Sequence, residues 1–206
     1  MRTSLCLALS VLLTASTTAF SQALNGKADI EFKVSATMHG FPGTVTSEPL
    51  VLERTGDQAK LEVAVPVEDM TTGNAKRDKE MHHMFRAEEH AFIKGHASID
   101  SLKGVQDGAT LPFTLTIAET EKEMMAEVSD WRLGDQALSF TVTFPVSLKD
   151  YDLKPPKILF FKVHDTVNVT ARFSFGKEIA HQDGLPHERG PELSLPVGAA
   201  PERRIS

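Results

Sequence analysis

Residues 138–148 read LSFTVTFPVSL, and their alternation decides the fold. Every even position in this stretch is apolar, and the odd positions carry serine, threonine or proline. Because successive side chains of a β-strand point to opposite faces, such a stretch buries one face and exposes the other. This pattern is typical of antiparallel strands, since strands of parallel sheets are apolar on both faces.

Seven further stretches show or approach the same alternation, and turn residues punctuate the chain between several of them. The clearest are 30–38, 61–67, 111–117 and 167–175, and the weaker ones are 44–53, 91–99 and 124–131. One stretch differs, because a capping cluster at 71–74 precedes apolar side chains at helical spacing over 75–87. The order is therefore three strands, one short helix and five further strands.

Eight long strands with one apolar face predict an all-β fold. We expect an extended eight-stranded antiparallel up-and-down barrel, lipocalin-like, with the helix between strands 3 and 4. A two-sheet sandwich of this length would show more and shorter strands. The inward positions are almost wholly aliphatic or aromatic. Such an interior either holds an apolar ligand or is filled by its own side chains, and the pattern leaves both open.

The two ends of the chain differ from this barrel domain, which we expect over 24–175. Residues 1–23 have a positive start at Met1 and Arg2, continue in an apolar run and end in small residues, which predicts a cleavable signal peptide and a periplasmic location. Cleavage is expected after Ala23, with Ala19 as the alternative. Residues 176–206 lack periodicity and contain several prolines and glycines, which predicts a disordered tail.

Composition excludes several classes of protein. The 206 residues carry a net charge of −6, so the chain lacks the basic surface that a nucleic-acid partner requires. No apolar stretch reaches about twenty residues, so stable membrane insertion is not expected. The one cysteine, Cys6, lies in the predicted signal peptide, which excludes a disulfide framework. Monomer and homodimer both stay open.

No motif for catalysis is present, and we expect no catalytic residues and no enzyme activity. A hydrolase would need a nucleophile beside a base, or two carboxylates in a pocket. Most acids fall on polar strand positions or in loops. Asp165 is the exception, because it lies between Val163 and Val167, and we expect it to be a structural residue at a strand edge.

Histidines are the candidates for an alternative function. His82, His83, His90 and His96 lie close together in the sequence. His82 and His83 would lie about 100° apart on a helix, so they do not form a chelating pair. We expect no metal site and histidines that are solvated or hydrogen-bonded in turns. A histidine-ligated haem or metal module, associated with electron transfer, is the alternative.

The stretch 70–81, MTTGNAKRDKEM, resembles the signature of the YceI-like polyisoprenoid-binding proteins, in which Arg-Asp opens a short helix after a strand. Weaker similarity lies at 38–40, 147–153 and 163–170, so the resemblance covers about 27–175. It implies periplasmic binding, transport or storage of a long-chain amphiphilic lipid, a polyisoprenoid or an isoprenoid quinone. Beyond such a bound lipid, we expect no cofactor.

Parity and bulk select the candidate ligand-binding residues of the lumen. They are Phe32, Val34, Met38, Phe113, Leu115, Phe140, Val142 and Phe144. The resemblance adds His96, which stands where the family has a phenylalanine and is therefore expected to place an imidazole in the lumen.

Overall fold

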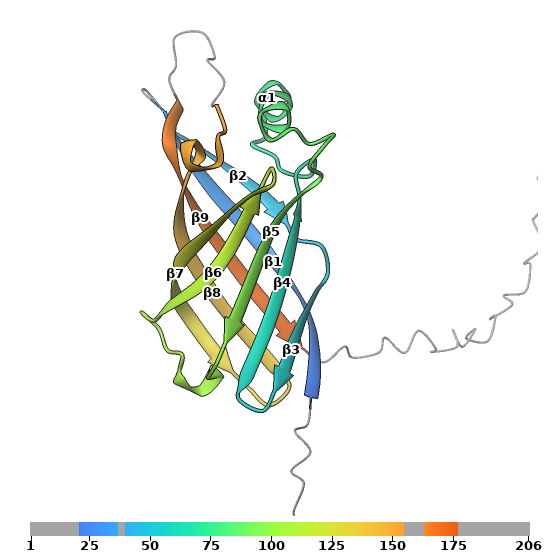
Figure 1. Ribbon diagram of the computed structural model, residues 1–206, viewed down its shortest axis with the longest axis vertical. Coiled ribbons are helices and arrows are strands. Elements are labelled where there is room, and N and C mark those ends of the chain that lie inside the picture. Colours follow the sequence, from blue (N-terminus) through green and yellow to red (C-terminus); the bar gives the residue numbers. More distant parts are fainter. Residues whose placement is uncertain (1–20, 37–39, 155–162, 177–206) are drawn as a thin grey trace, which may run out of the picture.

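The computed structural model of this chain is a closed antiparallel β-barrel with one α-helix (Figure 1). The structure describes residues 21–36, 40–154 and 163–176. Consecutive strands pair with each other, except that β2 and β3 both pair with β1, and β9 closes the ring by pairing with β1. The strands are β1 (Ser21–Ala36), β2 (Phe41–Thr46), β3 (Leu50–Thr55), β4 (Gln58–Pro66), β5 (Phe92–Ile99), β6 (Thr110–Ile117), β7 (Thr120–Leu133), β8 (Ala137–Ser147) and β9 (Val163–Gly176).

The predicted eight-stranded barrel is confirmed, with one strand divided in two. A bend at 47–49 separates β2 from β3 within the predicted strand 44–53. β1 pairs with β2 through Asp29–Val34 and with β3 through Ser21–Gly26, so the two short strands share one position in the barrel wall. Ser47 stabilises the bend, because its hydroxyl accepts a hydrogen bond from the Ala28 amide at 3.0 Å. The helix therefore follows β4 in this numbering.

Helix α1 (Ala75–Phe85) lies at one end of the barrel (Figure 1). It begins where the Asn74 side chain accepts a hydrogen bond from the Arg77 amide at 3.1 Å, which satisfies one free N–H of the first turn. It ends at Arg86, whose left-handed backbone (φ 53°) stops the helix. The predicted helix over 75–87 is thus confirmed, and Phe85 is its buried anchor.

The opposite end of the barrel is filled by side chains. Leu102 belongs to a short 3₁₀ helix, η1 (Leu102–Gly104), and is fully buried there. Asp57 holds this segment in place by accepting hydrogen bonds from the Ser101 hydroxyl at 2.6 Å and the Lys103 amide at 3.0 Å. Stacked aromatic rings lie above it, with the centroids of Phe140 and Phe173 4.8 Å apart. This end is therefore a packed core.

Parts of the predicted signal peptide and tail lie outside the described residues. Residues 1–20 and 177–206 belong to this group, whereas Ser21–Ala23 form the start of β1 and Gly176 ends β9. No helix in the described part of the chain has the length and apolar content needed to cross a membrane.

Candidate functional site

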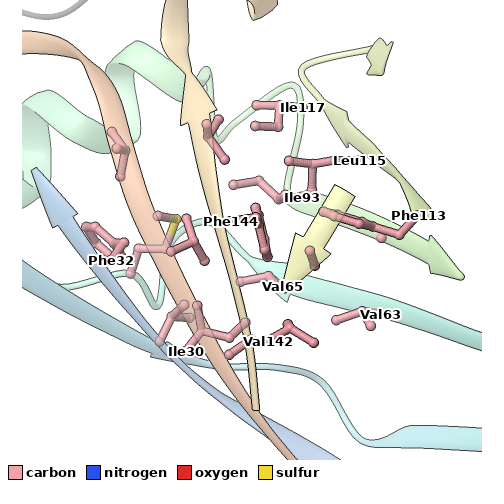
Figure 2. A pocket seen from close by; sticks show the side chains of 18 of the residues that line it. Ile30, Phe32, Val63, Val65, Ile93, Phe113, Leu115, Ile117, Val142 and Phe144 are labelled. Atoms are coloured by element: carbon pink, nitrogen blue, oxygen red, sulfur yellow. The ribbon is translucent and has the colours of Figure 1, made fainter. Parts of the chain in front are cut away.

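A cavity of about 220 Å³ lies in the lumen, between α1 and the aromatic rings of the packed end. Its wall is hydrocarbon over most of its area, because the inward positions of the strands are aliphatic or aromatic. Figure 2 shows side chains from β1, β4, β5, β6 and β8 converging on this space. Among the labelled ones are Ile30, Phe32, Val63, Ile93, Phe113 and Phe144.

Most of the predicted lumen residues lie on the wall of this cavity. They are Phe32, Val34, Phe113, Leu115, Phe140, Val142 and Phe144. Met38 lies outside the described residues. Contact of these side chains with a ligand stays a prediction.

His96 differs from the other candidates because it lies on the outward-facing parity of β5, and its contact with a ligand stays a prediction. His96 borders the cavity, but its side chain is 51% exposed, with Nδ1 3.9 Å from Oε1 of Glu62. The inward positions of β5 are Ile93, Gly95 and the other odd residues. A shift of one residue exchanges the two faces of a strand, so the position facing the lumen is Gly95, which has no side chain to fill it.

Further wall residues come from elements for which no candidate was named. β4 contributes Val63 and Val65, and β9 contributes Val167 and Val169. These four residues lie on the alternating apolar positions of their strands, so parity alone could have identified them. Met81 and Met84 of α1 also line the cavity, at its α1 end.

The polar lining of the cavity lies chiefly at the α1 end, in Thr72 and Arg77. The guanidinium carbon of Arg77 lies 4.5 Å from the centre of the Phe41 ring, a cation–π contact. Arg77 also donates from Nε to the Thr72 hydroxyl at 3.2 Å and from Nη2 to the Thr72 carbonyl at 3.0 Å. A cation is thus held at one end of an otherwise apolar cavity.

Asp78, the second residue of the Arg-Asp pair, stabilises the loop before α1. Its carboxylate accepts hydrogen bonds from the Thr72 amide at 2.8 Å and the Thr71 hydroxyl at 2.9 Å. Burial raises the pKa of Asp78, but the hydrogen bonds from Thr72 and Thr71 outweigh it and hold that pKa below its ordinary value. The pair therefore divides its roles, with Asp78 fixing the loop and Arg77 facing the cavity.

The histidines have separate surroundings. His82 Nε2 lies 2.8 Å from the Met70 carbonyl oxygen. His90 Nε2 is buried, has no hydrogen-bond partner and lies 3.9 Å from a carboxylate oxygen of Glu89. Within residues 21–36, 40–154 and 163–176, no three histidine, cysteine or acidic side chains gather as metal ligands. A haem or metal module stays a prediction without a supporting geometry.

Asp165 is part of a turn at the α1 end. Its carboxylate accepts hydrogen bonds from the Ser147 hydroxyl at 2.8 Å and the Lys149 amide at 2.7 Å. Both bonds hold the short helix η2 (Leu148–Tyr151) against the start of β9. This carboxylate has a structural role in the turn.

Comparison with known proteins identifies the family. The model of the YceI-like domain matches residues 14–175. A solved polyisoprenoid-binding domain from Saccharophagus degradans is 14% identical, with a TM-score of 0.56 over 74% of this chain and 98% of that domain. BcnA from Burkholderia cenocepacia is 11% identical, with a TM-score of 0.58 over 71% of this chain and 95% of its own. No curated protein matches the chain.

Proposed function

The chain belongs to the YceI-like domain family, and from this premise we propose that its barrel binds the apolar chain of a long amphiphilic lipid, a polyisoprenoid or an isoprenoid quinone. The similar domain from Saccharophagus degradans is a polyisoprenoid-binding domain, which supports this ligand class. The fold similarity supports a shared architecture, and the ligand has to be argued from the cavity of this chain.

The observation that carries the proposal is an apolar cavity along the axis of a barrel that is packed at one end. Burying hydrocarbon there contributes roughly 0.8 kcal/mol per CH₂ group, so a chain of several carbons binds without polar anchors. The cavity of about 220 Å³ is smaller than the 300–1,000 Å³ of typical small-molecule sites, so we expect the lumen to widen around a long chain.

The orientation of the ligand follows from the polar end of the cavity. Arg77 and Thr72 lie beside α1, and the opposite end holds the stacked rings of Phe140 and Phe173. An amphiphile is bound most favourably with its polar group near Arg77 and its chain toward those rings, because a polar group among the rings would have no hydrogen-bond partner.

We propose binding without chemistry, for transport or storage in the periplasm. The carboxylates of Asp78 and Asp165, at the α1 end, each accept hydrogen bonds that fix a turn, which supports structural roles for both.

The mass of the protein recovered from the periplasm tests both the location and the cleavage site of the signal peptide. Cleavage after Ala19 keeps the whole of β1, whereas cleavage after Ala23 removes three of its residues that pair with β3.

Lipid extraction tests the ligand directly. The full chain is expressed in a bacterium with a periplasm, purified without detergent, extracted with organic solvent and analysed by mass spectrometry. We expect about one prenyl lipid per barrel. Gly95→Leu, which points a side chain into the lumen, should lose the lipid, and Lys94→Leu on the outer face of the same strand should keep it.

Circular dichroism verifies that both variants fold. Extraction of no prenyl lipid from the parent protein, together with no binding of an added prenyl alcohol, would overturn the proposal.

A further inference from the structure

Among the described strands, β5 and β6 share the fewest register pairs of any two neighbours in the barrel wall, and the seam is the boundary between these two strands. Three register pairs join these strands, and His96↔Thr114 is the last of them. By contrast, β5 has eight pairs with β4, and β6 has eight with β7. Continuing the same register would place Ser98 opposite Pro112, which has no N–H to donate to a ladder. The ladder therefore stops half-way along the two strands.

Side-chain exposure shows that the unpaired half of the seam is thinly covered. Leu115 and Ile117, on the inward face of β6 beside the paired half, are 7% and 4% exposed. Leu111 and Phe113 lie on the same face of the same strand, beside the unpaired half, and are only partly buried. The inward face of β6 is thus buried where the ladder exists and partly exposed where it ends.

An outer groove follows this unpaired half and meets the lumen cavity. Ser98, Pro112 and Met125 lie along the groove, and Met125 is 55% exposed although it is apolar. Phe113 and His96 line both the groove and the lumen cavity. Of these two shared residues, Phe113 has the larger side chain and lies on the inward face of β6.

We propose that the apolar chain of the ligand enters and leaves sideways between β5 and β6, and that Phe113 is the side chain that controls this passage. The inference rests on the proposed function and adds the route to it. Movement of one ring and a slight parting of two strands that share three rungs would join the groove to the lumen. No rung of the ladder has to break for Ser98 and Pro112 to separate.

The α1 end is a less favourable route for a chain. Phe85, Tyr151 and Leu153 are 7%, 2% and 6% exposed in the described part of that end, and Met81 and Met84 pack against the same cluster. Opening there would expose several buried apolar side chains to water, which is unfavourable for each of them. The seam requires the displacement of Phe113, which is already partly exposed.

Cross-linking the seam tests the route. Cys6→Ser removes the chain's own thiol, and Ser98→Cys with Pro112→Cys places two thiols across the seam for a reducible bifunctional methanethiosulfonate reagent. Uptake and release of a fluorescently labelled prenyl alcohol are followed by stopped flow. We expect both rates to fall at least ten-fold when the link is present and to recover on reduction, with the equilibrium Kd unchanged within two-fold.

The matched control is Lys94→Cys with Thr116→Cys, which links the same two strands at a rung that already exists. Its rates should stay at the parental values. Unchanged rates in the Ser98–Pro112 link overturn the lateral route while leaving the binding function intact. Absence of probe binding in the unmodified protein overturns the proposed function itself.

Substitution of Phe113 provides a second measurement that needs no cross-link. Phe113→Ala should accelerate uptake and release several-fold, and Phe113→Trp should slow both. Phe32→Ala enlarges the lumen from the far wall, away from the seam, and should change the Kd without the same acceleration. Equal rate changes in Phe113→Ala and Phe32→Ala would contradict the role of Phe113.

Discussion

The ring of Phe113 on β6 meets the ring of Phe144 on β8 edge to face, with 4.8 Å between the centroids. β7 lies between these strands in the sheet, but its pairing with β8 begins only at Glu127↔Thr143. The described residues 120–126 of β7 are thus paired with β6 alone. The two rings make contact inside the barrel, next to the stretch where β7 and β8 are not paired.

Phe144→Ala should therefore destabilise the barrel more than the partial burial of its ring would predict. We expect a loss of about 3 kcal/mol, the lower end of the range for buried Phe→Ala changes, because the edge-to-face contact is lost with the packing. Urea unfolding, followed by fluorescence of the single tryptophan, Trp131, measures it. Phe92→Ala, at a ring that is 40% exposed, is the control and should cost under about 0.5 kcal/mol. Equal losses of stability in the two variants would contradict a stabilising contact between Phe144 and Phe113.

Gly43→Ala should disturb the lumen, because Gly43 pairs with Phe32 and an added Cβ would overlap the Phe32 ring. The ring has to move into the cavity, so we expect a loss of about 1–3 kcal/mol and weaker probe binding. Gly95→Ala is the matched control, since its Cβ would meet the Cβ of Val63 at an ordinary 3.6 Å. That variant should fold with unchanged or slightly higher stability. A tolerated Gly43→Ala would show that the Phe32 ring has room elsewhere.

Arg77→Gln should change which headgroups the cavity prefers. Replacing the guanidinium removes the cation at the α1 end, so affinity for a prenyl phosphate should fall about ten-fold, equivalent to about 1.4 kcal/mol. Affinity for the prenyl alcohol of equal chain length should stay within about two-fold. Titration calorimetry of both ligands gives the ratio. Equal losses for alcohol and phosphate would place the effect of Arg77 in folding rather than in headgroup binding.

Tyr151 should lose its proton at a higher pH than an ordinary tyrosine. It is the only tyrosine of the chain, so its ionisation can be measured directly. Burial raises the pKa of Tyr151 to about 12, and the carboxylate of Asp150 adds to this. The raised pKa means that the folded state favours the neutral phenol. The contribution of this phenol to the stability of the folded state is complete below pH 10 and is lost as the pH rises from 10 to 12. Absorbance at 295 nm should show a midpoint near pH 12 when folded, and a folded midpoint near 10 would contradict the burial.

Tyr151→Phe provides the matching stability measurement. The Tyr151 hydroxyl lies 3.5 Å from the Leu115 carbonyl oxygen, so its loss should cost under about 1 kcal/mol at neutral pH. Above pH 10 the variant should lose less stability than the parent, because it has no group to ionise there. Parallel pH curves for the two proteins would assign the alkaline loss to other groups.

The barrel could be predicted from the sequence because a strand with one buried face has an apolar residue at every second position. Phe140 and Val142 were identified in this way, and the same rule would have found Val63 and Val169. The expectation for His96 came from the resemblance, whereas strand parity places Ile93 and Gly95 on the inward face of β5. A difference of one position exchanges the two faces of a strand.

The remaining features depend on distant partners and leave no local signal. The pairing of β5 with β6 ends at His96↔Thr114. The sequence of one strand does not determine how far it pairs with another. The bend at Ser47 depends on Ala28, whose amide it accepts. Arg77 belongs to the signature at 70–81, but its position over the Phe41 ring depends on how α1 packs on the barrel.

The closing pair, β1 and β9, sets the order in which this chain can fold. Ala28 is made early and pairs with Phe173, which is made near the end of the domain. Contacts between such distant residues form slowly, because a long loop must close first. Until then β1 can pair with β2 and β3, which follow it directly, and its other edge stays exposed to unwanted pairing with other chains. The lumen is enclosed only when β9, the last strand of the barrel, has been synthesised and has paired with β1.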